Sequence, residues 1–293
     1  MSFSEARPEY SPALRCASAA AIAGTICLSF GISAAWGNVV ETREFEERVV
    51  LDAGDMEVVV ENVFGSIRVV GYDGDVVELS GIETITGDRQ RDVDRARDEV
   101  SLRTEQTDGR LVFRVSRGNG CDCNYGRRWS GYTVAYDLEL RVPRTVAFDI
   151  STVNRGDIEI EGVHGDFRVS NVNGSVTLSG LRNAGHVETV NGRLTASFDL
   201  VPKDSTSFKT VNGEVDVTFP SELSADLRFR TMRGDIRTDF EAEPLAVPPT
   251  SEVENAGSTV IRTQRQAAVR VAGGGPTYSF ETLNGDITVR ESR

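Results

Sequence analysis

The sequence predicts an all-β protein, in which a β-solenoid with about 18 to 21 residues per coil follows an N-terminal β-sheet region with one short helix. Three observations predict this fold. The phrase Thr-aliphatic-Asn-Gly recurs through the second half of the chain, its glycines are evenly spaced, and apolar and polar residues alternate after each glycine. A fixed period of this length is typical of repeat folds, in which stacked units bury a common core.

The first 35 residues predict a secretory signal. Arg7 and Arg15 precede an Ala-rich apolar run from Ala17 to Ala35, which ends in a small-x-small cleavage site. A retained membrane anchor over residues 17–35 is the alternative, because the run approaches the length that spans a bilayer. We therefore expect an exported protein of the periplasm, cell envelope or medium, or one anchored in the membrane by this segment.

Residues 38–150 predict the N-terminal β region. The stretch from Gly87 to Glu99 is dense in Arg and Asp, with apolar residues at helical spacing, and predicts a short exposed helix. Asp108-Gly109 then lies between two alternating runs and predicts a hairpin turn. The strand-like runs of this second part are Val100 to Thr104, Leu111 to Val115, Tyr132 to Val142 and Thr145 to Ile150.

The loop between the hairpin and the next strand is the candidate recognition element. Basic and aromatic residues together offer surfaces that suit sugars or anionic polymers, and loops on rigid scaffolds often bind ligands. A disulfide between Cys121 and Cys123 that pins the loop over the solenoid edge is an equal alternative, although so small a ring would be strained. The candidate residues are Arg117, Tyr125, Arg127, Arg128, Trp129 and Tyr132.

Residues 151–293 hold the repeats. Gly156, Gly174 and Gly192 are 18 residues apart, and Gly192, Gly213 and Gly234 are 21 apart. This period fits two strands of about nine residues per coil. Alternation after each glycine directs aliphatic side chains inward and charged ones outward. The Pro-rich stretch from Glu241 to Gly257 predicts a flexible excursion before the last strands.

The Asn-Gly pairs are predicted to be structural turns. Both residue types tolerate positive φ, so we expect the backbone to turn sharply at the same corner of every coil. Because stacked strands lie about 4.7 to 4.9 Å apart, the asparagines are expected to align as a side-chain ladder. The pairs are Asn173-Gly174, Asn191-Gly192, Asn212-Gly213 and Asn284-Gly285.

Charge and motifs restrict the chemistry. Lys and Arg number 32 against 45 Asp and Glu, a net charge of −13, which argues against nucleic-acid binding and against binding an anionic membrane by charge alone. We predict no catalytic, cofactor or metal site. His164 and His186 lie near turns, acidic residues such as Asp157 and Asp286 occupy solvated corners, and signatures of zinc hydrolases, nucleophile elbows and phosphate loops are absent from the sequence.

These phrases resemble the bacterial putative-adhesin domain family, whose exported or envelope-associated members have no known molecular function. The resemblance covers roughly Val58 to Val289. It rests on the repeated Val-Asn-Gly phrases, on Val142-Pro143 before them, and on the closing run from Tyr278 to Ile287. It implies a right-handed single-stranded β-helix, and the handedness follows from the resemblance alone. The loop around Cys121 and the charged helix depart from the family pattern.

Three functions remain open from the sequence. The first is a non-enzymatic envelope protein whose rigid solenoid presents a surface to an envelope polysaccharide or protein. The second is a carbohydrate-active lyase or hydrolase, which requires several carboxylates and a basic residue converging in one groove. The third is a scaffold that self-assembles through its solenoid ends. We expect no cofactor and no nucleic-acid partner, and membrane attachment only through an uncleaved N-terminal segment.

Overall fold

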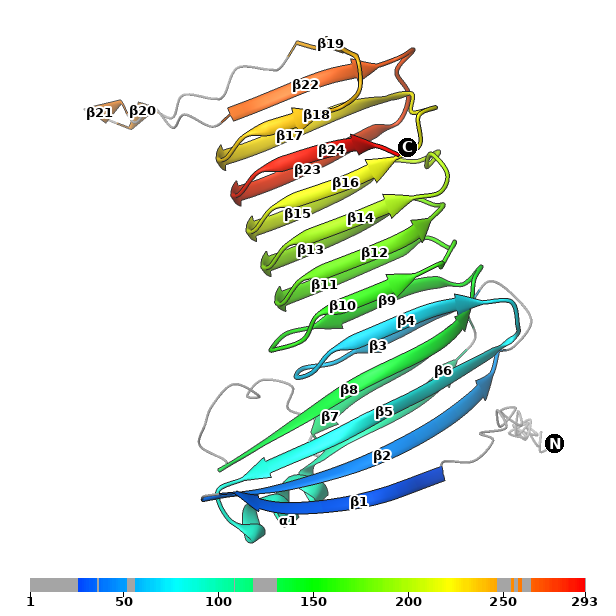
Figure 1. Cartoon of the computed structure of the whole chain (residues 1–293), viewed down its shortest axis with the longest axis vertical. Coiled ribbons are helices and arrows are strands. Elements are labelled where there is room, and N and C mark those ends of the chain that lie inside the picture. The colour runs from blue at the N-terminus through cyan, green and yellow to red at the C-terminus, as the bar shows by residue number, and fades with distance from the viewer. Residues whose placement is uncertain are drawn as a thin grey trace, which may run out of the picture.

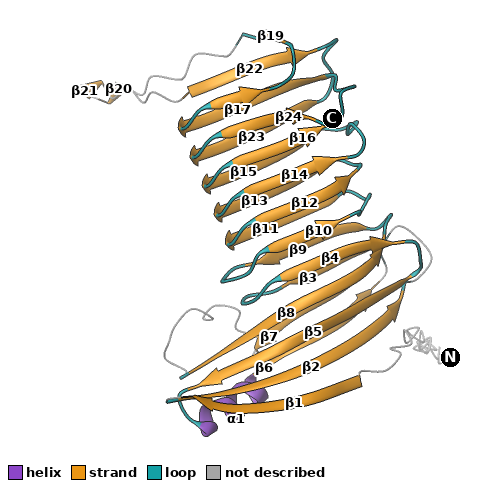
Figure 2. Cartoon of the chain, in the orientation of Figure 1, coloured by secondary structure: helices purple, strands orange, loops and turns teal. Residues whose placement is uncertain are grey.

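The computed structural model describes residues 26–35, 37–51, 56–107, 109–117, 131–246, 254–255, 258–259 and 265–292. These residues are mostly strand, with one helix, α1 (Gln90–Glu99) (Figure 2). Two sheets of 11 strands each form two layers with the apolar core between them (Figure 1). The all-β solenoid predicted from the sequence is confirmed.

The spatial order of the strands differs from their order along the chain in both sheets. Sheet A runs β1 (Ile26–Ala35), β2 (Asn38–Val50), β5 (Val76–Gly87), β8 (Tyr132–Pro143), β4 (Ile67–Tyr72), β10 (Ile158–Glu161), β12 (Val176–Leu181), β14 (Leu194–Phe198), β16 (Val215–Phe219), β24 (Ile287–Glu291) and β18 (Ile236–Thr238). Sheet B runs β19 (Ala242–Pro244), β22 (Arg265–Val271), β17 (Ala225–Arg233), β23 (Thr277–Asn284), β15 (Thr206–Asn212), β13 (Gly185–Asn191), β11 (Phe167–Asn173), β9 (Ala147–Thr152), β3 (Glu57–Glu61), β7 (Arg110–Arg117) and β6 (Val100–Thr107). A separate pair comprises β20 (Glu254–Asn255) and β21 (Ser258–Thr259).

We call one strand of sheet B and its partner strand of sheet A a rung. Successive rungs pair in parallel and in register, as Ile158 with Val176 in sheet A and Phe167 with Phe148 in sheet B. The alternation predicted after each turn glycine is confirmed, because Ile158 and Ile160 are buried while Asp157 and Glu159 are exposed. Between the sheets, aromatic rings stack from rung to rung, with Phe208 and Phe280 centroids 5.5 Å apart.

Rungs are inserted out of chain order at both ends of the stack. The rung β23/β24 lies between β15/β16 and β17/β18, so the closing phrase at Asn284 occupies the place next to last. At the other end, β3/β4 lies between β7/β8 and β9/β10. The chain therefore passes over an inserted rung at each end (Figure 1). The antiparallel strands β22 and β19 extend sheet B beyond β17.

The predicted asparagine ladder is confirmed at the corner from sheet B to sheet A. Asn191 donates to Asn173 Oδ1 at 2.9 Å, Asn212 donates to Asn191 Oδ1 at 2.9 Å, and Asn284 donates to Asn212 Oδ1 at 2.8 Å. Asn173 continues the ladder to Asn154 at 3.4 Å. Arg233 occupies the equivalent position in the rung β17/β18, so the ladder of asparagine side chains ends there.

The predicted reason for the turn glycines is wrong at most corners. No asparagine of the ladder has positive φ, and neither do Gly174, Gly192 and Gly213. The glycines are needed because the backbones approach closely: a Cβ on Gly192 would lie 2.0 Å from the carbonyl oxygen of Gly174. Gly285 is the exception with φ of 159°, and its Cβ would meet the Gly213 oxygen at 1.9 Å. Glycine is therefore required at these corners because the rungs stack closely, and not because the turn needs a positive φ.

The Thr of each phrase points inward and the aliphatic residue after it points outward. Thr189 and Thr282 are buried, and their hydroxyls donate to the carbonyls of Gly174 and Gly213, at 3.2 and 3.0 Å. This bond satisfies a carbonyl at the corner that the ladder does not reach. The residues that follow the threonines form a solvent-facing aliphatic column of Val63, Val153, Val172, Val190, Val211, Leu283 and Met232.

Local signals in the N-terminal region are confirmed. Strands β6 and β7 pair antiparallel from Val100 with Arg117 to Thr107 with Arg110, and α1 lies within the predicted helical stretch. The strands on either side of Pro143 lie in different sheets, because β8 joins sheet A and β9 joins sheet B. The predicted signal segment falls partly outside the described residues. Its last ten residues form the edge strand β1, paired antiparallel with β2, and its cleavage stays a prediction.

Candidate functional site

The structure describes two of the six candidate recognition residues. Arg117 ends β7 and Tyr132 begins β8, and together they form the base of the loop. Both bind Glu99 at the end of α1: Arg117 Nε donates to Glu99 Oε2 at 2.9 Å and the Tyr132 hydroxyl donates to the same oxygen at 2.5 Å. Tyr125, Arg127, Arg128 and Trp129, and the predicted disulfide pair Cys121 and Cys123, lie outside the described residues.

The contacts at the base of the loop favour an ionised Glu99 and a neutral Tyr132. Hydrogen bonds from Tyr132 and Arg117 lower the pKa of Glu99. Burial, followed by the hydrogen bond to Glu99, raises the pKa of Tyr132 to about 12. The guanidinium groups of Arg95 and Arg117 lie 5.6 and 5.8 Å from the centroid of the Tyr132 ring. The two candidate residues are therefore bound to α1 within the fold, and their part in recognition stays a prediction.

An open groove of about 390 Å³ lies on the outer face of sheet A, where β2, β5, β8 and β4 meet. Sequence reasoning missed this groove, because its lining comes from four strands far apart in the sequence. Ile82 is 43% exposed there. Asp137 on its wall accepts hydrogen bonds from the backbone and side chain of Ser66, at 2.9 and 2.7 Å. Its remaining charged lining residues are Glu44, Glu46, Arg68 and Glu139.

The acidic residues after the turn glycines bind backbone at the corners. Asp157 accepts from the Ser175 amide at 2.7 Å, and Asp286 accepts from the Asp235 amide at 2.8 Å. Other outward carboxylates pair with arginines of neighbouring rungs, as Asp216 does with Arg290 at 2.8 Å. Charges are thus spread along the rungs. In the repeats this is the pattern predicted for a scaffold. The groove on sheet A does gather four carboxylates and Arg68, as a carbohydrate-cleaving groove would, but Arg68 pairs with Glu159 and Glu161 and Asp137 is bound by Ser66.

One set of residue types on sheet B is shared with hydrolase active sites. His186 Nδ1 contacts the Ser207 hydroxyl, and His186 Nε2 lies 3.3 Å from Glu188 Oε2. All three side chains project from an open sheet face, where the backbone amides of β13 and β15 lie within parallel ladders. An oxyanion needs free N–H donors beside the nucleophile, and this face offers none from the strands that carry the three residues. The arrangement is a surface hydrogen-bond chain.

Within the part of the chain that the structure describes, no group of three or more His, Cys, Asp or Glu side chains is placed to hold a metal ion. His164, the second histidine, lies near the Arg144 turn. Burial, then Arg182 and Arg144, lowers its pKa. Over the same described residues, no helix combines the length and apolarity needed to cross a membrane.

Comparisons with known proteins identify the domain family to which the repeats are similar. The family model of the Toastrack DUF4097 domain matches residues 140–290. No curated protein sequence is similar to the chain. A solved structure of a "putative cell adhesion protein" from Clostridium sporogenes is 8% identical, covers 84% of this chain and 99% of its own, and superposes with a TM-score of 0.38. A "putative adhesin" from Bacteroides fragilis is 15% identical over 86% of this chain and 97% of its own, with a TM-score of 0.36.

The matched segment runs from the end of β8 to β24 and contains every Asn-Gly corner. It thereby confirms the family resemblance inferred from the Val-Asn-Gly phrases. Strands β1 to β7 and helix α1 precede the match. Because the family model spans just over half of the 293 residues, the chain belongs to the Toastrack DUF4097 family.

Proposed function

We propose that this protein is a non-enzymatic component of the cell envelope, which presents its solenoid as a rigid surface to an envelope polymer or protein. The predicted N-terminal signal segment supports export. The Ser207, His186 and Glu188 chain lacks the donors that a hydrolase needs, and outward carboxylates such as Asp157 and Asp216 are already bound at a corner or in an ion pair. The groove on sheet A is the one feature that a lyase or hydrolase would share, and its single basic residue, Arg68, is already paired with Glu159 and Glu161.

One observation carries the proposal: equivalent residues form straight columns along the stack. The register from β9 to β17 keeps each outward position aligned from rung to rung. Successive rungs lie about 4.8 Å apart, so a column repeats the same chemistry at short, constant intervals. The asparagine ladder locks this spacing at the corner. A linear partner can contact several rungs at once, and the rigid face limits the ordering cost of binding.

Cosedimentation tests the proposal. The purified protein is mixed with isolated cell-wall polysaccharide and, separately, with envelope membrane fractions, and the pelleted protein is quantified. We expect the protein to pellet with at least one fraction. A variant in which a short Gly-Ser linker replaces residues 118–130 separates the surfaces: loss of binding assigns recognition to the loop, and retained binding assigns it to the solenoid face. Protein that stays in the supernatant with every fraction contradicts the proposed function.

A further inference from the structure

The outer face of sheet B and the adjoining corner carry a cluster of cations at the β17 end of the stack. We call Lys209, Arg228, Arg230 and Arg233 the basic patch. All four side chains are exposed, on β15 and β17, and the inserted strand β23 lies between these two strands. Glu281 is aligned with Lys209 on one side and Arg230 on the other, and it pairs with Arg230 at 3.2 Å. Lys209, Arg228 and Arg233 form no ion pair with any residue that the structure describes.

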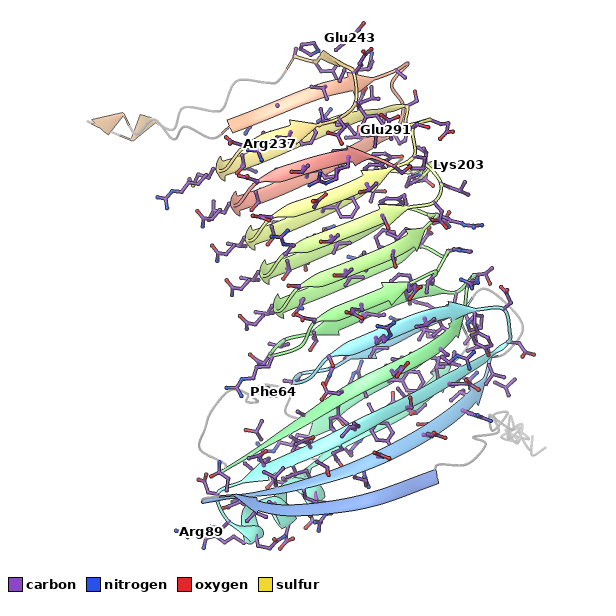
Figure 3. All side chains as sticks on the ribbon, viewed as in Figure 1. Phe64, Arg89, Lys203, Arg237, Glu243 and Glu291 are labelled. Atoms are coloured by element: carbon purple, nitrogen blue, oxygen red, sulfur yellow. The ribbon has the colours of Figure 1, made fainter. Side chains whose placement is uncertain are left out.

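Several other cations of the stack are neutralised by carboxylates across rungs. In sheet B, Arg110 pairs with Glu57 at 2.8 Å and Arg114 pairs with Glu61 through two hydrogen bonds. In sheet A, Arg193 pairs with Glu214 at 2.5 Å. Arg237, labelled in Figure 3 on the sheet A side of the β17/β18 rung, pairs with Asp235 and Asp286. The basic patch does not stabilise the strand pairing, since like charges on one face repel. It is a local excess of positive charge on a chain whose net charge is −13.

The geometry of the basic patch suits an extended anion. Arg228 and Arg230 are two residues apart on β17 and project from the same face, about 7 Å from one another. Arg233 lies at the corner, so the three arginines span about 16 Å along the strand. Leu283, which is 40% exposed, and Met232 border the patch and belong to the aliphatic column. Planar guanidinium groups bind carboxylates through paired hydrogen bonds, and the aliphatic border offers contact to the C–H faces of sugar rings.

We propose that the basic patch binds a linear acidic polysaccharide whose sugar rings carry carboxylates. The proposal rests on the proposed function and names its ligand class and its surface. Lys209 is aligned with Glu188 and Glu281 on its two sides, so the polymer is expected to follow β17. A polymer one chain wide that runs along β17 contacts the arginines of the patch and remains within about 10 Å of them, a Debye length at moderate salt. A planar anionic membrane would also face the acidic residues of the neighbouring strands, which disfavours membrane docking.

Charge reversal tests the basic patch. The double variant Arg228→Glu/Arg233→Glu changes two exposed cations that form no ion pair in the described structure. The matched control is Arg91→Glu/Arg103→Glu, which makes the same charge change at exposed positions of α1 and β6, in the N-terminal region. Affinity for polygalacturonate is measured by titration at low and moderate salt, with dextran as the uncharged polymer. Thermal unfolding verifies that both variants fold.

We expect the protein to bind polygalacturonate and not dextran, with affinity that falls as salt rises. The patch variant should bind about 10- to 100-fold more weakly, because charge-assisted hydrogen bonds are lost, while the control keeps its affinity within about twofold. Equal affinity of the two variants, or no binding of polygalacturonate by the protein, overturns the proposal. Tighter, patch-dependent binding to poly(glycerol phosphate) or to phosphatidylglycerol vesicles overturns the ligand class.

Cosedimentation of the patch variant separates this inference from the proposed function. If the patch variant still pellets with envelope fractions while its affinity for polygalacturonate is unchanged, the basic patch is not the recognition surface and the proposed function stands. If the unmodified protein pellets with no fraction, the proposed function fails together with the inference.

Discussion

At the corner of each rung, four successive residues have four separate structural roles. In the β13/β14 rung, the buried Thr189 donates a hydrogen bond to the Gly174 carbonyl, and Val190 faces solvent. Asn191 is part of the asparagine ladder, and Gly192 allows the close approach of the neighbouring backbone. The roles of Thr189, Asn191 and Gly192 concern the neighbouring rung and not the corner's own backbone angles. The repeated phrase is therefore a stacking motif, and its substitutions should act through contacts between rungs.

Replacement of Gly192 by Ala should destabilise the fold by about 3 kcal/mol or more. The new Cβ would lie 2.0 Å from a backbone oxygen of the rung before, and that oxygen is fixed within the stack. Urea unfolding measures the loss. Gly273→Ala is the matched control, because its Cβ would meet only the Ser224 hydroxyl at 3.7 Å. Similar midpoints for the two variants would contradict the stacking explanation.

Asn191→Ala should cost about 1 kcal/mol of unfolding free energy. Asn191 donates to Asn173 and accepts from Asn212, so its removal breaks two hydrogen bonds that are partly replaced by water. Asn183→Ala serves as the control, since the side chain of this exposed asparagine makes no hydrogen bond with any other described residue. A loss no larger than that of the control would show that the ladder fixes register without adding stability.

Tyr278 should make the fold sensitive to alkali. Burial raises the pKa of Tyr278 to about 12, above its usual value near 10. The unfolded chain therefore loses this proton first, and the stability that the neutral phenol contributes is present below about pH 10 and is lost as pH rises towards 12. Tyr278→Phe removes the hydrogen bond to the Pro202 carbonyl, so it should be less stable at neutral pH. Its urea midpoint should fall less between about pH 8 and pH 11. A parallel fall in both proteins would contradict this assignment.

At the scale of the element, the inserted strand β23 connects the aromatic core across the end of the stack. The Phe280 ring stacks on Phe208 at 5.5 Å and on Phe229 at 5.3 Å between centroids, and these three rings come from three different rungs. The strand also carries Tyr278 and Thr282, whose hydroxyls bind backbone carbonyls of the preceding part of the chain. Strand β23 therefore joins the β17/β18 rung to the rest of the core.

Phe280→Ala should lower the unfolding free energy by about 3 to 5 kcal/mol, because a fully buried ring leaves a cavity shared by three rungs. Calorimetry or urea unfolding measures the change. Leu283→Ala on the same strand is the control and should change stability by less than about 0.5 kcal/mol, since its side chain is 40% exposed. Hydrogen exchange should show that β17 and β22 lose protection before β11 and β13 in the Phe280 variant.

Elements whose signals lie within one short segment were predictable from the sequence. Helix α1, the β6–β7 hairpin and the strand after each turn glycine depend on neighbouring residues alone. The glycine requirement was not predictable, because Gly192 meets an oxygen that belongs to another rung. Nor was the groove around Ile82, whose lining comes from four strands, or the base of the loop at Glu99, which meets Arg117 and Tyr132 only in the folded chain.

At the scale of the whole molecule, the sequence predicts how many rungs exist better than where they lie. Each phrase contains the residues that one rung needs, so rungs are recognisable singly. The order of the phrases along the chain does not give the order of the rungs in space, because Gly285 stacks on Gly213 and Gly234 stacks on Gly285. The inserted phrase at Asn284 resembles those of its neighbours, so it does not reveal its place in the stack, although Arg233 replaces the ladder asparagine in the end rung β17/β18. The inserted strand β23 also separates Lys209 on β15 from Arg228 and Arg233, which share β17.

The inserted rungs also determine how the molecule responds to mechanical load. A pull on β24 acts on two parallel ladders at once, to β16 on one side and β18 on the other. Such a pull along the strand shears many hydrogen bonds together, and the β17/β18 rung blocks the path by which β24 could be peeled off the stack. The last strand of the solenoid is therefore held on both sides against a pull along the chain.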